Sequence, residues 1–172
     1  HITSAIRQLR SGHANQDEIL LTLQDSLDQL KLSIDALNLP PGDITALLAN
    51  LRYRLEPRFK AMGLALEWAV VPLPAIARLD ASAMRQLQFI LFEAFSNSMQ
   101  HAHASVLRIE ATPALQDATG LRIRVSDDGV GFDTHTVVRK GLASMEERAR
   151  AIGAQLHIKG QAGQTEVEIL LR

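Results

Sequence analysis

Apolar side chains recur at alternating intervals of three and four residues between Gln16 and Asn38. They are Leu20, Leu23, Leu27, Leu30, Ile34 and Leu37. This spacing predicts a helix with a narrow heptad stripe, which suits packing against another helix. Ile2, Ile6 and Leu9 repeat the spacing on a shorter stretch before a predicted turn at 11–15, so residues 1–39 should form a helical hairpin.

Two helices cannot enclose a core alone, so we expect two copies of the chain to complete a four-helix bundle and form a homodimer through this hairpin. The first predicted helix spans about 15 Å and the second about 33 Å. Because of this difference, and because the chain begins with His1 rather than Met, we expect a fragment whose first helix is truncated. The alternative is a hairpin that packs on the rest of the chain.

Pro40-Pro41-Gly42 ends the hairpin and predicts a second domain over residues 43–172. There the 3.6-residue periodicity predicts helices over 43–62, 80–101 and 141–152. Alternating apolar residues predict strands over 64–70, 106–112, 121–126, 156–158 and 167–171. Strands joined through turns, with helices kept to one side, indicate an α+β sandwich of mixed sheet and helices.

The composition narrows the possible functions. The chain has 172 residues, with 18 Lys and Arg against 19 Asp and Glu, and it has no Cys. The near-zero net charge argues against a basic nucleic-acid-binding surface, and the lack of Cys excludes disulfides and thiol catalysis. No apolar run is long enough to span a membrane, so we expect a cytoplasmic segment without direct membrane contact. A membrane anchor elsewhere in the full-length protein stays open.

The helix predicted over 80–101 is apolar on nearly every side, yet it carries Glu93, Asn97, Gln100 and His101 within one arc of its surface. Burying such groups without partners is costly, so this stripe needs a reason. It could cap neighbouring loops within the fold. Alternatively, Asn97 could offer its carbonyl oxygen to a magnesium ion, while Glu93 could orient water or accept a proton.

A second candidate site is the segment Val125-Ser126-Asp127-Asp128-Gly129-Val130-Gly131-Phe132. An Asp-Gly after an alternating strand is most often a hairpin turn. Here, however, the next residues show no matching alternation and lead to a predicted helix at Gly141. A glycine loop between a strand and a helix N-terminus suits close backbone approach to a phosphate-bearing ligand. The segment is neither a P-loop nor a dinucleotide fingerprint.

These features together resemble bacterial two-component sensor histidine kinases, in particular the nitrate-sensor and desaturase-sensor subfamily with short dimerisation and phosphotransfer helices. EAFSNSMQHAHAS (93–105) is similar to that subfamily's N box, and VSDDGVGFD to its first glycine box. KGLASMEERARAIGAQLHIKG is similar to the second glycine box, and GQT at 163–165 to the terminal Gly-Gly-Thr element. The resemblance implies the Bergerat-type ATP-binding fold shared with gyrase, Hsp90 and MutL, with ATP and Mg²⁺ as cofactors.

For the adenine end of the site, the resemblance implies that Asp127 accepts a hydrogen bond from the adenine amino group. Gly129 and Gly131 let the loop pass close to the nucleotide, and Thr165 supports the adenine pocket.

For the phosphate end, the resemblance implies that Asn97 holds the magnesium ion, with Glu93 beside it. His101 lies near the phosphates, and Gly141 and Leu142 close the lid.

The family pattern implies transfer of the γ-phosphate to a histidine, and from it to an aspartate of a response regulator. This chain departs from the pattern in three places. Gln100 stands where the family often has Lys, and Arg139 replaces the first glycine of the second box. An acceptor His followed by an acidic residue is absent, since neither His1 nor His13 fits, so we expect the acceptor upstream of this segment. The alternative is a degenerate ATPase fold that serves as a dimerisation module without kinase activity.

Overall fold

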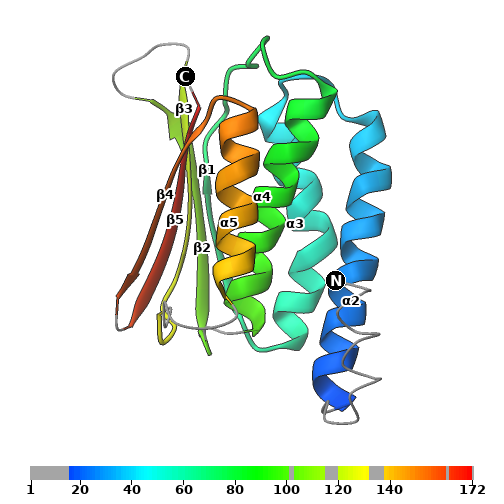
Figure 1. Ribbon diagram of the computed structural model, residues 1–172, viewed down its shortest axis with the longest axis vertical. Coiled ribbons are helices and arrows are strands. Elements are labelled where there is room, and N and C mark those ends of the chain that lie inside the picture. The colour runs from blue at the N-terminus through cyan, green and yellow to red at the C-terminus, as the bar shows by residue number, and fades with distance from the viewer. Residues whose placement is uncertain (1–15, 101–102, 115–119, 132–137, 162, 172) are drawn as a thin grey trace.

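The computed structural model describes residues 16–100, 103–114, 120–131, 138–161 and 163–171. In these residues a layer of helices packs on one face of a five-stranded sheet, and the first described helix lies on the far side of that layer (Figure 1). The α+β class predicted from the sequence is therefore confirmed. The short arm expected over residues 1–15 lies outside the described residues.

The long helix predicted from the heptad spacing is α2, Gln16–Asp35, which continues into a 3-10 helix, η1, Ala36–Asn38. A turn through Pro40 and Gly42 separates it from α3, Ile44–Ala61. Asp43 caps α3, because its carboxylate accepts a hydrogen bond from the N–H of Ala46 at 2.9 Å.

α2 buries a face other than its leucine stripe. The six stripe residues are 45–73% exposed. The buried residues Asp25, Asp28, Leu32 and Ala36 form a second face at helical spacing, which packs on the neighbouring helices, α3 among them. The alternative in which this arm packs on the rest of the chain is therefore realised by α2, and the leucine stripe faces outward.

The strands are β1, Ala65–Val70; β2, Val106–Pro113; β3, Leu121–Asp127; β4, Gln155–Gln161; and β5, Gln164–Leu171. They lie in the order β1-β2-β3-β5-β4, with β1 parallel to β2 and the remaining pairs antiparallel. Ile109, Val125 and Val167 are aligned in register on three neighbouring strands and are buried. One face of the sheet thus forms half of the core.

Two helices lie against this face, α4, Ala81–Gln100, and α5, Val138–Ala151 (Figure 1). α4 is buried along most of its length, as its apolar composition predicts. Phe95 of α4 packs edge-to-face on Phe59 of α3, with ring centroids 6.0 Å apart. α5 begins at Val138 rather than at the predicted Gly141, so Gly141 lies inside the helix. α4 is therefore the central helix that positions the polar stripe.

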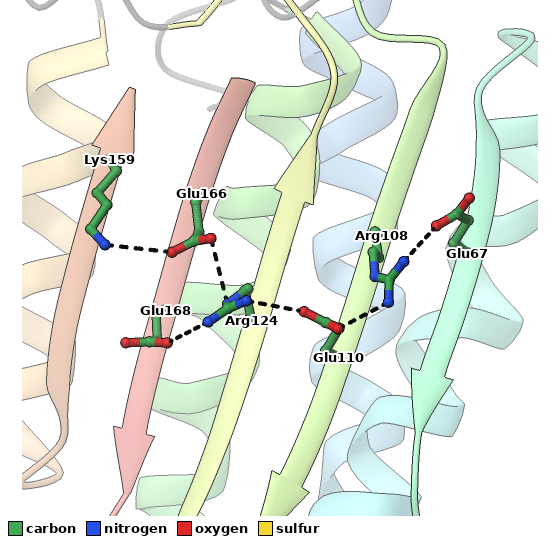
Figure 2. Close-up of polar contacts among 7 residues, drawn as sticks. All are labelled: Glu67, Arg108, Glu110, Arg124, Lys159, Glu166 and Glu168. Atoms are coloured by element: carbon green, nitrogen blue, oxygen red, sulfur yellow. Dashed lines mark hydrogen bonds and ion pairs between the residues drawn. The ribbon is translucent and has the colours of Figure 1, made fainter. Parts of the chain in front are cut away.

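The other face of the sheet carries a row of alternating charges that crosses all five strands (Figure 2). Arg108 on β2 pairs with Glu67 at 3.2 Å and with Glu110 at 3.1 Å, and Arg124 on β3 pairs with Glu168 at 3.2 Å. The Arg108–Glu110 pair lies within β2, whereas the other two join neighbouring strands, and a cross-strand pair of this kind contributes on the order of 0.5 kcal/mol. The pairing explains how this face remains uncovered by helices in the described chain.

Candidate functional site

Asn97 lies in the last turns of α4 and is only 9% exposed. Its Nδ2 is buried and has no hydrogen-bond partner among the described residues. Leaving a buried polar group unpaired costs about 1–3 kcal/mol, so such groups call for an explanation. An amide whose oxygen can face a hard cation and whose nitrogen can meet a phosphate oxygen fits a magnesium–phosphate ligand. Asn97 is therefore suited to the role that the resemblance implies.

Asp127 ends β3 and is 5% exposed. Its Oδ2 accepts a hydrogen bond from Ser98 Oγ at 2.6 Å, and its Oδ1 accepts one from the N–H of Gly129 at 3.1 Å. Thr165 lies opposite Asp127 in the register of β3 and β5 and is also buried. The fold thus brings Asp127, Gly129 and Thr165 together beside α4. A carboxylate held in this way can accept a hydrogen bond from a ligand amino group.

The glycine loop begins directly after Asp127. Gly129 is buried, and Gly131 has φ 81°, a conformation that favours glycine. Asp128 fastens the loop to β2, because its Oδ1 accepts hydrogen bonds from the N–H groups of Val106 at 2.8 Å and Ser105 at 2.7 Å. These bonds lower the pKa of Asp128, since they stabilise the charged carboxylate. Residues 132–137, which follow the glycine loop, lie outside the described residues, and residues 138–140, expected to precede the next helix, belong to α5.

Glu93 lies one turn before Asn97 on α4 and is half-buried. The early part of α5 packs directly onto it, because a Cβ at Gly141 would overlap with Glu93 Oε1. Leu142 is half-buried and packs against the hydrophobic core. Gly141 therefore joins α5 to α4 at Glu93. A cavity of about 310 Å³ opens beside this contact, between Gln29 of α2, Glu93 of α4 and Arg148 of α5.

Arg148 is held at the edge of this cavity. Its guanidinium stacks over the ring of Phe89 at 4.4 Å and donates to Gln86 Oε1 at 2.6 Å. These contacts fix the cation near Glu93 on the wall that α5 contributes.

The structure describes one of the last two residues of the predicted polar stripe. Gln100 turns toward α2, where its Nε2 donates to the carboxylate of Asp25. His101 lies outside the described residues.

Sequence reasoning missed a polar cluster that joins α2 to α3 and α4. Asp25 is fully buried and accepts hydrogen bonds from Arg58 at 2.5 Å, from Ser96 and from Gln100. The same Arg58 nitrogen lies 3.0 Å from Asp28. The signal was present as a second helical repeat on α2 at residues 25, 28, 32 and 36. We refer to Asp25, Asp28, Arg58, Ser96 and Gln100 as the Asp25 cluster.

In the described part of the chain, no helix is long and apolar enough to cross a lipid bilayer. Within the same residues, no three His, Asp or Glu side chains gather as potential ligands of a metal ion.

The chain is similar in sequence and in structure to known sensor histidine kinases. The sensor histidine kinase YdfH of Bacillus subtilis strain 168 is 33% identical over 97 residues, which cover 53% of this chain and 23% of YdfH. The matched part of the chain therefore spans about a quarter of the length of that relative. Histidine kinase AdeS of Acinetobacter baumannii has a similar structure, with a TM-score of 0.65 and 18% identity over 99% of this chain and 93% of that chain.

The structure of full-length ShkA in complex with AMPPNP matches with a TM-score of 0.62 and 27% identity, over 88% of this chain and 35% of that chain. The family described as histidine kinase-like ATPase domain matches residues 55–160, which include the polar stripe of α4 and the glycine loop. Since this match covers more than half of the sequence, the chain belongs to the family of histidine kinase-like ATPase domains.

Proposed function

We propose that this chain is the catalytic region of a sensor histidine kinase of the nitrate-sensor and desaturase-sensor type. Residues 43–172 form its ATP-binding domain, and residues 1–39 form the dimerisation and phosphotransfer hairpin. The observation that carries the proposal is the buried Asn97, whose Nδ2 has no hydrogen-bond partner in the described part of the chain. The next residue of α4, Ser98, donates a hydrogen bond to Asp127. The ATPase family and the resemblance to YdfH support it.

In this proposal Asp127 accepts a hydrogen bond from the adenine amino group, in a pocket supported by Thr165 and closed by Gly129 and Gly131. The β3–β5 register and the bonds to Asp127 support this assignment. A neutral base is recognised best where the acceptor is fixed before binding, because less ordering is then required.

At the other end of the nucleotide, Asn97 offers its Oδ1 to the magnesium ion, which neutralises charge on the phosphates when bound. Glu93 lies one turn away and orients or deprotonates the attacking group, while His101, Gly141 and Leu142 enclose the phosphates. The γ-phosphoryl group leaves ADP as its bond to the bridging oxygen breaks, and a bond forms to an imidazole nitrogen upstream of this segment. A response-regulator aspartate then takes the group from that histidine.

The proposal is tested by titration calorimetry with ATP and magnesium. Asp127→Asn should weaken ATP binding at least tenfold, because the adenine amino group then faces an amide. Asn97→Ala should weaken the binding of magnesium-ATP by a similar factor. Asp80→Asn is the matched control, since Asp80 caps α4 on the exposed side and asparagine caps equally well. Absence of ATP binding by the parent protein would contradict the proposal.

One observation favours the alternative of a dimerisation module without kinase activity. Gln100, which stands where the family often has Lys, is engaged by Asp25 of α2. Transfer of radiolabel from ATP to a longer form of the protein that includes the upstream histidine would rule out this alternative. ATP binding without transfer in that form would support it.

A further inference from the structure

Ser98 lies directly after Asn97 on α4 and is buried, and its hydroxyl contacts the carboxylate of Asp127 on β3. The distance from Ser98 Oγ to Asp127 Oδ2 is 2.6 Å, and that from Ser98 Oγ to the carbonyl oxygen of Ala94 is 3.3 Å. A serine inside a helix often donates to the carbonyl four residues earlier. Here the nearer of the two acceptors is a carboxylate on another element, which favours a short, charge-assisted hydrogen bond to Asp127.

Asp127 is thereby held from two directions. Ser98 donates to Oδ2 from the helix, and the N–H of Gly129 donates to Oδ1 from the glycine loop. Each carboxylate oxygen can accept two hydrogen bonds, so both retain capacity for a ligand. Without Ser98, the hydrogen bond that remains to this carboxylate among the described residues is the 3.1 Å bond from the loop, which restrains its rotation about the Cβ–Cγ bond less.

We infer that Ser98 is a positioning residue for recognition of the nucleobase. It orients the Asp127 carboxylate so that the free acceptor direction meets an exocyclic amino group, and it selects bases that donate at this place over bases that do not. The inference rests on the proposed function, because it requires Asp127 to be the acceptor for the base. Since Ser98 and Asn97 are consecutive on one helix, the site for the base and the site for the phosphates are held at a fixed distance from each other.

The test compares two ligands that differ only in the amino group, ATP and purine riboside 5′-triphosphate, each titrated calorimetrically with magnesium. Ser98→Ala should weaken ATP binding about tenfold and change binding of the purine riboside triphosphate less than about twofold. Ser98→Thr retains the hydroxyl and should keep the preference for ATP. Ser96→Ala is the matched control, because Ser96 is a buried hydroxyl on the same helix that donates to Asp25 instead.

Each outcome decides a separate question. An equal loss of both ligands in Ser98→Ala would mean a structural role and overturn the inference, as would an unchanged ratio of the two affinities. If the parent binds neither ligand, the proposed function fails. A third result would overturn the inference about Ser98 alone. In that result the parent prefers ATP, Asp127→Asn abolishes the preference, and Ser98→Ala retains it. Thermal unfolding of each variant shows that the comparison concerns folded protein.

Discussion

Gly141 of α5 lies against the carboxylate of Glu93 on α4, so closely that a methyl group at residue 141 would overlap with Glu93 Oε1. Gly141 sits inside a helix, and its backbone angle is not in the left-handed region that is typical of glycine in turns. Lack of a side chain, rather than conformational freedom, is therefore what this position requires. The contact joins the start of α5 to the candidate catalytic residue.

We predict that Gly141→Ala lowers phosphoryl-transfer activity without lowering the stability of the fold. Alanine is favoured over glycine inside a helix by about 1 kcal/mol, and the overlapping atom is the flexible end of a side chain, so the protein should unfold at an equal or higher temperature. Displacement of Glu93 should nonetheless reduce phosphoryl transfer at least tenfold. Thermal unfolding and transfer of label in the longer form measure the two effects.

Ala143→Gly is the control for this substitution, because Ala143 is exposed on the same helix. It should lower the unfolding temperature slightly and leave transfer unchanged. Unimpaired transfer by Gly141→Ala would contradict the role of this contact.

A second prediction concerns the Asp25 cluster. Arg58→Ala leaves the fully buried carboxylate of Asp25 without its cation, which should destabilise the docking of α2 by about 3–5 kcal/mol. Hydrogen exchange of the α2 amides should accelerate by orders of magnitude, while amides in the sheet change little. Lys60→Ala on the same helix should have almost no effect, since Lys60 is 74% exposed and pairs only with Glu56 in the described structure. Uniform acceleration across both regions would show that Arg58 serves the whole domain instead.

The contacts of the Asp25 cluster and of Ser98 could not be predicted from the sequence. The described helices and the sheet strands follow apolar periodicities, which are local properties of the chain, and the stripe of α4 was visible in the same way. The pairing of Asp25 with Arg58 joins residues 33 positions apart, and that of Ser98 with Asp127 joins residues 29 positions apart. A periodic pattern shows which face a residue occupies, but a charge becomes buried only where tertiary packing brings its partner. The burial of Asp25 and Asp28 therefore does not follow from the sequence pattern alone.

Two glycines with the same backbone conformation allow a matched test of close packing. Gly42 has φ 73° and Gly63 has φ 74°, so an alanine at either position should cost about 1–2 kcal/mol. A Cβ at Gly42 would also overlap with the carbonyl oxygen of Ile76, whereas a Cβ at Gly63 would meet no atom within 4 Å. Gly42→Ala should therefore lose about 1–3 kcal/mol more than Gly63→Ala in denaturant unfolding. Equal losses would mean that the turn before α3 moves freely.

The hydrogen bonds to Asp128 predict a specific acid sensitivity. The N–H groups of Val106 and Ser105 lower the pKa of Asp128 in the folded state. Its contribution to the free energy of unfolding is therefore complete above the unfolded pKa of about 4 and is lost as the pH falls through the lower folded value. Asp128→Asn should be less stable than the parent at pH 7, with the difference shrinking toward pH 3. A constant difference over this range would exclude a role for the charge.

The exposed leucine stripe of α2 predicts how the proposed homodimer forms. Leu27 and Leu30 are 47% and 58% exposed, whereas Leu32 on the buried face is 1% exposed. The double substitution Leu27→Glu and Leu30→Glu should produce a monomer in sedimentation, because glutamate is excluded from an apolar seam between helices. The unfolding temperature should stay within a few degrees of the parent value, because glutamate is solvated on an open face. Leu32→Glu should instead lower that temperature strongly, since it forces a charge into the contact with the second domain. A dimer that survives the double substitution would place the interface elsewhere and leave the stripe as a surface of this chain alone.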